Sequence, residues 1–235
     1  RPSRLRRRAT AAFISGSNPG AANGAGAPEA QLPMTLPGLM MDVPLLVSGI
    51  IDYAAAAHGE TEIVARTVEG GIFRYDYRRA QGRAKQLAQA LMRLGVNAGD
   101  RVGSLAWNTH HHLELFYGVS GMGAVLLTVN PRLSQEQLFY ILDHAAPRWL
   151  CIDAATLPIA EKLASRLATV QGYIYLSTDA VPPANHLPDL LAYEALLAGE
   201  TGDYDWPEFD ERSASTLCYT SDPTGKPKGV LYSHR

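Results

Sequence analysis

Short apolar runs alternate with helical stretches over residues 101–177, and this alternation constrains the fold more than any other feature of the sequence. The strand-like runs are RVGSLAW, AVLLTV, RWLCI and GYIYLS, and the stretches between them with helical spacing are 110–122, 134–145 and 156–168. Strands that are joined by helices pair in parallel, because a parallel connection needs a long crossover. The sequence therefore predicts an α/β fold of layered, largely parallel sheets with flanking helices.

The segment before this alternation predicts two helices and a β-hairpin. Apolar spacing favours a helix over 45–58, which Gly59 is expected to close in a left-handed conformation. Strand-like TEIVART and GIFRY flank a Glu-Gly-Gly turn, which indicates a hairpin. Asp76 is expected to cap the next helix, and Gly95 to end it. The basic residues of that helix are expected mostly on its solvated face, which is favoured over binding to an acidic partner: Arg78, Arg79, Arg83, Lys85 and Arg93.

Local signals further along are fewer. Ser134 and Gln137 have the spacing of a capping box, which predicts a helix start. Residues 178–211 are looser, with a short helix expected near Leu190–Leu197. The acidic run 200–211 is interpreted as a solvated connection rather than an interaction site.

Composition excludes several classes of protein. The net charge is only -2, with 21 Lys and Arg against 23 Asp and Glu, so no basic field is available to hold nucleic acid. The longest uncharged run of the patterned region, 115–131, contains three glycines and predicts a buried helix and a strand rather than a membrane span. Two cysteines, Cys151 and Cys218, are too few for a disulfide framework, which favours a reducing, cytoplasmic setting.

Residues 1–33 differ from the rest of the chain. They carry five Arg and one Glu, and residues 15–30 are almost all Gly, Ala, Ser, Asn and Pro, which predicts a disordered, low-complexity extension. A secretion signal, an organellar presequence and an upstream reading frame joined to a start at Met34 are the interpretations left open. At the other end the sequence stops in a strand-like segment, so we expect a truncated chain.

Two motifs that suggest chemistry are weak. His110-His111-His112 invites a metal site, but consecutive helical residues point about 100° apart, so no metal ligands are predicted there. No G-x-S-x-G elbow occurs, because the nearest match at 118–122 ends in Met, so a serine hydrolase is unsupported.

The informative stretch is CYTSDPTGKPKGVLYSHR at 218–235, in which one apolar strand enters a Ser/Thr/Gly/Lys loop and another leaves it. Its donors are hydroxyl, backbone N–H and ammonium groups at Thr220, Ser221, Thr224, Gly225, Lys228 and, as an alternative cation, Lys226. A polyphosphate needs donors of this kind. A Walker A loop does not fit, because Pro227 follows Gly225-Lys226. From the residues alone, phosphate binding and a plain surface turn both stay open.

The motif YTSDPTGKPKG resembles the YTSGTTGxPKG phosphate loop of the adenylate-forming acyl-CoA synthetase superfamily, and GVLYSHR resembles the strand that follows it in fatty acyl-CoA ligases. The similarity covers roughly 34–235 and is typical of the medium- to long-chain branch in MMDVPLLVSGII, AQALMRLGVNAGDRV, LAWNTHHHLELFYGVSGMGAV, NPRLSQEQLFYILDHA and YDWPEFDE. It implies that 34–235 is the first half of an AMP-binding adenylation domain, truncated after the phosphate loop.

The resemblance implies a two-step reaction. A fatty carboxylate attacks the α-phosphate of Mg-ATP to give an acyl-adenylate and pyrophosphate, and the thiol of coenzyme A then displaces AMP. Lys228 would be the catalytic cation of the loop. The positions that match the nucleotide-binding loop are Thr220, Ser221, Asp222, Pro223, Thr224, Gly225, Lys226 and Gly229. The resemblance assigns no residue of this chain as a metal ligand.

Two loop positions depart from the family pattern, because Asp222 stands where the family has Gly and Pro223 where it has Ser or Thr. A carboxylate about 4 Å from a phosphate charge costs on the order of 4 kcal/mol at an effective dielectric near 20. Pro223 removes a backbone donor and a hydroxyl, and a hydrogen bond to a charged group contributes roughly 1.5 to 3 kcal/mol. Both changes predict weaker ATP binding.

Three hypotheses therefore stand beside one another. The first is part of a cytoplasmic fatty-acid–CoA ligase that uses fatty acid, ATP and CoA, with the fragment alone inactive. The second is a non-catalytic descendant that keeps an acyl or nucleotide pocket but has a disabled loop. The third is a sister adenylating enzyme with another acyl acceptor. No transmembrane segment or nucleic-acid partner is expected. Peripheral membrane association stays open. No sequence pattern indicates an oligomeric state.

Overall fold

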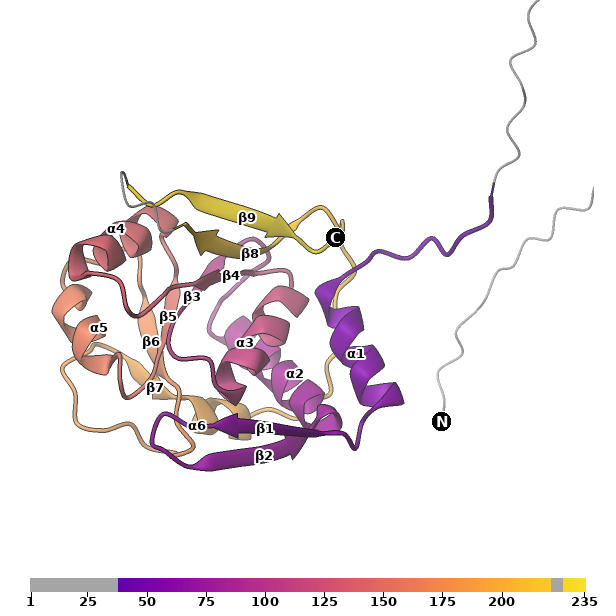
Figure 1. The fold of residues 1–235 in the computed structure, drawn as a ribbon, viewed down its shortest axis with the longest axis horizontal. Helices are drawn as coiled ribbons and strands as arrows, with labels where there is room; N and C mark the ends of the chain where they lie inside the picture. The colour runs from indigo at the N-terminus through magenta and orange to yellow at the C-terminus, as the bar shows by residue number, and fades with distance from the viewer. Residues whose placement is uncertain (1–37, 221–225) are drawn as a thin grey trace, which may run out of the picture. The chain divides into compact units, whose positions relative to one another are not determined.

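A seven-stranded sheet forms the centre of the protein in the computed structural model, which describes residues 38–220 and 226–235 (Figure 1). The strand order is β7-β6-β5-β3-β4-β8-β9. Neighbouring strands are parallel except β8 and β9, which are antiparallel, so the predicted α/β fold with a largely parallel sheet is confirmed. The strands are β3 (Arg101–Leu105), β4 (Val125–Thr128), β5 (Trp149–Ile152), β6 (Gly172–Tyr175), β7 (Leu190–Ala192), β8 (Ala214–Tyr219) and β9 (Gly229–Ser233).

Helices cover both faces of this sheet (Figure 1). On one face, α4 (Gln135–Ala145) and α5 (Leu157–Ala164) bury an apolar stripe against the strands. On the other face, α2 (Tyr77–Arg93), α3 (His110–Gly121) and α6 (Tyr193–Ala198) form a second core. Burial on both faces explains why the parallel strands are nearly continuous apolar runs instead of alternating ones.

The predicted hairpin is confirmed as a separate two-stranded sheet of β1 (Glu62–Arg66) and β2 (Ile72–Asp76). Its turn needs Gly70, whose φ of +96° lies in the left-handed region that favours glycine. The preceding helix is α1 (Val47–Ala57), and Ile51 of α1 packs with Tyr75 of β2 in a small third core.

Most helix ends follow local side-chain signals. The Asp76 carboxylate accepts the Arg79 N–H at 2.8 Å and begins α2, while Gly95, at φ +81°, follows its end. Ser134 and Gln137 form the predicted capping box at the start of α4. These predictions are confirmed because capping depends only on residues within one helical turn.

One local prediction is wrong and another is correct only in part. Gly59 is not left-handed; a Cβ there would lie 2.5 Å from the Ala55 carbonyl oxygen, so close backbone approach is what requires glycine. The short helix expected near Leu190–Leu197 is present as α6, but it begins only at Tyr193, because residues 190–192 pair with β6 as β7. Pairing with an existing sheet edge overrides the helical preference of this short segment.

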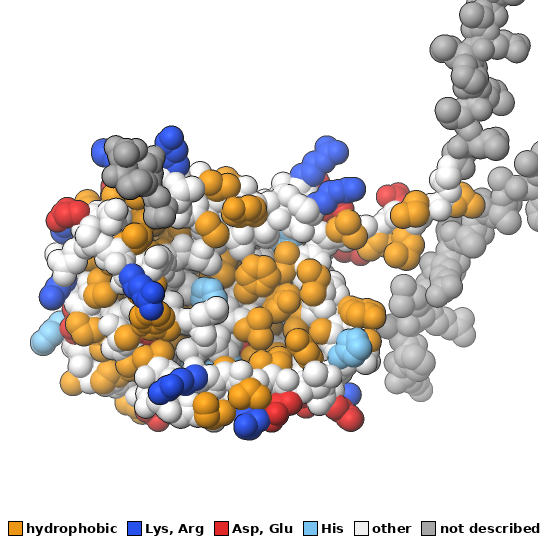
Figure 2. Space-filling model, in the orientation of Figure 1, with side chains coloured by type: hydrophobic (Ala, Val, Ile, Leu, Met, Phe, Trp, Pro, Cys, Tyr) orange, Lys and Arg blue, Asp and Glu red, His pale blue; other side chains and the backbone are white. Residues whose placement is uncertain are grey.

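One surface of the described protein is noticeably apolar. Figure 2 shows hydrophobic side chains gathered over α1 and α3, where Ile50 and Tyr53 of α1 are 59% and 68% exposed. In the described part of the chain, no helix combines the length and the apolar content needed to cross a bilayer. The predictions for residues 1–33 lie outside the described residues.

Candidate functional site

The candidate loop lies between the antiparallel strands β8 and β9 (Figure 1). Tyr219 of β8 is paired with Gly229 of β9. One step further, the Thr220 N–H donates to the Lys228 carbonyl oxygen at 3.0 Å, and the Lys228 N–H lies 3.4 Å from the Thr220 hydroxyl oxygen. The strand–loop–strand arrangement is therefore confirmed for both flanks, and the loop begins and ends at one closed rung of the ladder.

The predicted loop residues divide into two groups. Ser221, Asp222, Pro223, Thr224 and Gly225 lie outside the described residues. Of the others, the side chains of Thr220, Lys226 and Lys228 are exposed, which leaves a hydroxyl and two cations beside the loop.

Gly229 has a packing role that its motif position does not reveal. A Cβ at Gly229 would lie 3.2 Å from Cζ of Tyr219 and 3.2 Å from Cδ1 of Leu217. These distances are tighter than ordinary van der Waals contact, so a larger residue at 229 would require the Tyr219 or Leu217 side chain to move by a few tenths of an ångström. Glycine at this position therefore leaves room for the Tyr219 and Leu217 side chains.

A hollow of about 350 Å³ lies next to the loop, at the carboxyl ends of β3, β4 and β8. Its polar groups include His112 and Asn130, and Cys218 and Tyr219 form the side next to the loop. Nδ1 of His112 is 2.9 Å from the Ser104 hydroxyl, and burial lowers the pKa of His112, which favours a neutral ring. Open α/β sheets bind ligands at this end of their strands.

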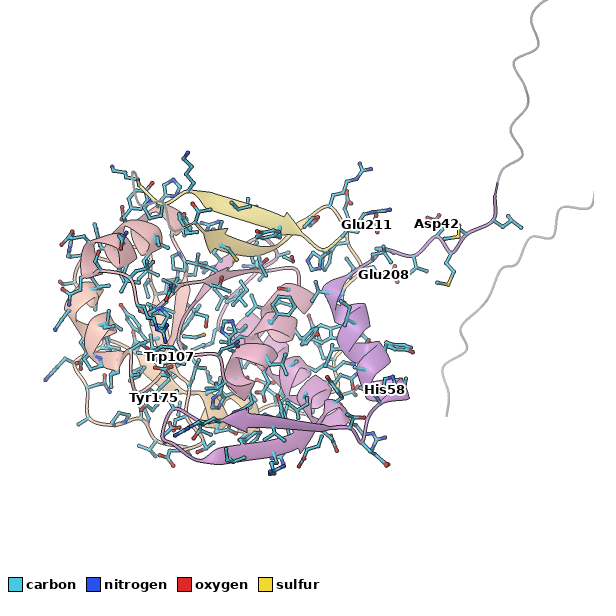
Figure 3. All side chains as sticks on the ribbon, in the orientation of Figure 1. Asp42, His58, Trp107, Tyr175, Glu208 and Glu211 are labelled. Atoms are coloured by element: carbon cyan, nitrogen blue, oxygen red, sulfur yellow. The ribbon has the colours of Figure 1, made fainter. Side chains whose placement is uncertain are left out.

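The point at which the strand order reverses lies between β3 and β5. Trp107 follows β3 and Tyr175 ends β6, and both are labelled at this end of the sheet in Figure 3. The backbone N–H of Trp107 donates to the buried carboxylate of Asp153 at 2.6 Å. The other oxygen of Asp153 accepts the Thr156 N–H at 3.0 Å. A second hollow, of about 420 Å³, opens beside these residues and is lined by Trp107, Thr109 and Ala155 together with the hairpin residues 66–68. Free space at this edge therefore lies both beside the loop and at the reversal point.

A larger hollow of about 550 Å³ runs beneath the β8–β9 hairpin. It is mainly apolar, with residues such as Val125, Phe209, Leu217 and Leu231 in its lining. Apolar groups do not provide the donors that phosphate requires. The smaller polar hollow is therefore the better candidate for a nucleotide site.

The histidine run differs from the sequence-based expectation. The rings of His110 and His111 lie 3.8 Å apart between centroids, and their nitrogens and a Glu194 oxygen lie within 4.8 Å of one another. Only His112 points elsewhere, to Ser104. Contrary to our expectation, the side chains of His110 and His111 therefore converge, because side chains in the first turn of a helix can fold toward each other.

This cluster already contains a cation. Arg83 was expected in solvent, but its side chain is only 11% exposed and donates to both oxygens of Glu194, at 3.0 and 2.6 Å, and to Glu114 at 2.8 Å. The Tyr193 hydroxyl donates to the other Glu114 oxygen at 2.7 Å. Because Arg83 occupies the Glu194 carboxylate, we interpret the cluster as a buried ion-pair network.

The network changes the pKa values of its members. Burial lowers the pKa of His110 to about 3, with the charges of His111 and Arg83 acting in the same direction. Burial would raise the pKa of Glu194, but the His111 ring, whose Nε2 lies 3.6 Å from a Glu194 oxygen, and the two Arg83 hydrogen bonds outweigh burial and bring the pKa to about 2. His110 is therefore neutral and Glu194 ionised near neutral pH.

Sequence analysis missed the contacts that α4 makes with the loop flanks. Nδ1 of His144 is 2.6 Å from the Tyr219 hydroxyl, and the Lys226 ammonium is 5.3 Å from the centroid of the Tyr140 ring. Tyr140 and His144 are four residues apart, so the helix period predicts a shared face. No local signal shows that this face meets a strand 75 residues later.

Comparison with known proteins adds a family match. The model of a family described as AMP-binding enzyme matches residues 51–235. The 3-methylmercaptopropionyl-CoA ligase of Ruegeria pomeroyi is 46% identical over 84% of this chain and 37% of its own length. The medium-chain-fatty-acid–CoA ligase of Ectopseudomonas oleovorans is 39% identical over 84% and 36%. The long-chain-fatty-acid–CoA ligase of Thermus thermophilus is 41% identical over 85% and 35%.

Solved structures agree on the fold. An anthranilate CoA ligase in complex with anthranoyl-AMP superposes with a TM-score of 0.69 at 22% identity, over 82% of this chain and 35% of that one. The N-terminal domain of FACL13 from Mycobacterium tuberculosis superposes with a TM-score of 0.66 at 24% identity, over 80% and 44%. The chain spans a little over a third of the length of the three curated relatives named above.

Proposed function

Because the chain belongs to the family of AMP-binding enzymes, we propose that the full-length protein is an AMP-forming acid–CoA ligase and that residues 34–235 form the first part of its adenylation domain. In this reaction a carboxylate oxygen attacks the α-phosphorus of ATP, and the bond to pyrophosphate breaks. The CoA thiol then attacks the acyl carbon, AMP leaves, and the thiol proton passes to solvent. The low cysteine content supports a cytoplasmic setting.

The observation that carries the proposal is the position of the YTSDPTGKPKG segment. It leaves the sheet at the carboxyl end of β8, beside the polar hollow, and its ends are closed by the Thr220–Lys228 rung. The donors of the described flanks are a hydroxyl and two ammonium groups, which suit phosphate oxygens. Mg²⁺ bound with ATP would neutralise part of the phosphate charge.

Within this proposal, Lys228 is the catalytic cation. Its exposed ammonium would stabilise the charge that develops on the departing pyrophosphate. The Thr220 hydroxyl and the Lys226 ammonium would hold the phosphates in line for attack on the α-phosphorus. The loop as a whole would act by positioning and by charge neutralisation.

The acid substrate is the finer part of the proposal. A medium- or long-chain fatty acid is the first candidate, supported by relatives named fatty-acid–CoA ligases at 39% and 41% identity. A short sulfur-containing acid is the second, because relatives named 3-methylmercaptopropionyl-CoA ligase have the higher identities of 44% and 46%.

The test is ATP–pyrophosphate exchange by the full-length protein with 3-methylmercaptopropionate, octanoate and palmitate in turn, followed by detection of the CoA thioester. Exchange with one acid identifies the substrate class. Exchange without a thioester would instead favour the sister enzyme with another acceptor. Absence of exchange with every acid, together with no heat on titration with Mg-ATP, would favour the non-catalytic descendant.

Lys228→Met tests the assigned role in the same assay. Losing the ammonium that stabilises the charge on the leaving pyrophosphate should lower exchange at least 100-fold, since each 1.36 kcal/mol of lost stabilisation is tenfold in rate. Lys162→Met is the matched control, because Lys162 is an exposed residue of α5 outside the loop. Equal exchange by the Lys228→Met variant and the control would remove Lys228 from the mechanism.

A further inference from the structure

Both ends of the phosphate loop contact the same helix, α4. At the amino end, the Tyr219 hydroxyl lies 2.6 Å from Nδ1 of His144. At the carboxyl end, the Lys226 ammonium lies 5.3 Å from the centroid of the Tyr140 ring. These two loop residues flank the segment 221–225, so α4 reaches the loop where it begins and where it ends.

The two α4 side chains also contact each other. The rings of Tyr140 and His144 are stacked, with planes 16° apart and centroids 5.6 Å apart. The Tyr219 ring meets the His144 ring edge-on at 88°. Tyr219, His144, Tyr140 and Lys226 therefore form one continuous chain of contacts from one end of the loop to the other.

The helix that carries Tyr140 and His144 is anchored in the core. The capping box at Ser134 and Gln137 defines the start of α4, and Leu138, Ile141 and Leu142 are buried in the core beneath the sheet. On the opposite side, Gly229 leaves just enough room for the Tyr219 ring. Burial raises the pKa of Tyr219, so its hydroxyl stays protonated and can donate to His144.

We propose that Tyr140 and His144 are positioning residues that hold the two ends of the phosphate loop on α4, so that the loop donors are preorganised for the ATP phosphates. This inference rests on the proposed function of the loop. Neither side chain touches the reacting atoms in this proposal. Their effect is to restrict where Thr220, Lys226 and Lys228 can lie, and preorganisation of this kind reduces the ordering cost of binding.

The test measures ATP–pyrophosphate exchange and thioester formation by the full-length protein. Tyr140→Leu removes the aromatic face and should raise the KM for ATP about two- to fivefold, because this factor corresponds to the binding free energy of a cation–aromatic contact at an exposed site. Tyr140→Phe keeps the aromatic face and should restore the wild-type KM. The KM for CoA should stay unchanged in both variants, because the loop holds ATP.

A double-mutant cycle tests the amino end of the loop. Tyr219→Phe and His144→Phe each remove the same hydrogen bond while keeping an aromatic ring. Each should raise the KM for ATP by a similar factor, and the double variant should be no worse than either single one. Asp143→Asn is the control on the same helix, because Asp143 is exposed and next to His144.

The outcomes separate this inference from the proposed function. An active wild-type protein whose KM for ATP is unaffected by Tyr140→Leu, or fully additive effects of Tyr219→Phe and His144→Phe, would overturn the inference alone. Equal rises in the KM for ATP and for CoA would mean general loss of structure and would also overturn it. A wild-type protein without exchange would overturn both the proposed function and the inference.

Discussion

The environment of Arg83 in the structure differs from the one that its sequence neighbours predict. In the sequence it is one of several basic residues of a helix, whereas in the structure it pairs with Glu114, whose side chain is fully buried, and with Glu194. A buried carboxylate that loses its partner is strongly destabilising. The same residue type can therefore be a surface charge or a core element within one helix.

Arg83→Met should lower the free energy of unfolding by about 3 to 5 kcal/mol, because it leaves Glu114 buried without a counter-charge. Arg78→Met is the matched control on the same helix. Arg78 is 63% exposed and only 3.9 Å from an exposed Glu60, so its loss should cost under about 0.5 kcal/mol. Urea unfolding of both variants measures the difference, and equal costs would contradict the buried network.

The Asp222-Pro223 pair is the second prediction at the scale of residues. Replacing Asp222 with Gly and Pro223 with Thr would remove a carboxylate from the proposed phosphate loop and add a backbone donor and a hydroxyl. We expect ATP–pyrophosphate exchange by the full-length protein to rise at least tenfold, since about 1.4 kcal/mol is a factor of ten. The single substitutions serve as controls, and equal exchange by the double variant and wild type would refute the prediction.

At the scale of elements, the contact between α2 and α3 depends on glycine. A Cβ at Gly118 of α3 would lie 2.8 Å from Cδ2 of Leu87 and 2.9 Å from the Ala84 carbonyl oxygen. The backbone oxygen cannot turn aside as a flexible side chain can, so the two helices would have to separate. Glycine at this position is therefore a requirement of close helix packing.

Gly118→Ala should destabilise the protein by about 1 to 3 kcal/mol through overpacking. Gly82→Ala is the matched control in α2, where a Cβ would meet nothing within 4 Å. That variant should stabilise the protein by about 0.5 to 1 kcal/mol, because alanine favours helix over glycine. Opposite shifts in thermal midpoint are the expected result, and shifts of the same sign would contradict the packing argument.

The elements also show where local prediction succeeds. The start of α2 at Asp76 and of α4 at Ser134 follow from capping groups within one turn, and both are confirmed. The strand β7 was missed because residues 190–192 become a strand only by pairing with β6. The residues within one turn are enough to predict where a helix begins. A short edge strand forms only because a neighbouring strand pairs with it, so its own residues do not predict it.

At the scale of the whole molecule, pH dependence reports on the buried network. The pKa of His110 falls from its ordinary 6.5 to about 3, so the unfolded state binds its proton first as pH decreases. The stability associated with neutral His110 is present above pH 6.5 and is lost as pH falls toward 3. Glu194, lowered from 4.5 to about 2, adds a further loss below pH 4.5.

The free energy of unfolding should therefore decrease as pH falls below 6.5 and decrease more steeply below 4.5. Each group contributes a slope of at most about 1.4 kcal/mol per pH unit. His110→Phe should flatten the part between pH 6.5 and 4.5, whereas His58→Phe, at an exposed position, should leave it unchanged. Urea titrations across this range provide the measurement, and identical profiles for both variants would contradict the assignment.

The sequence alone determined the α/β class, the hairpin, the caps at Asp76 and Ser134, and the strands on both sides of the loop at 220–229. These features depend on periodicity, on capping within one turn and on side-chain chemistry, all of which are local. The family resemblance is likewise carried by contiguous motifs, and the family match at 51–235 confirms it.

Only the tertiary structure decided the strand order, the burial of Arg83, the meeting of His110 with His111, and the contacts of Tyr140 and His144 with the loop flanks. Each of these joins residues through the packing of elements or the side-chain conformations that packing allows. Such choices depend on which faces can be buried together, and one-dimensional patterns do not contain that information.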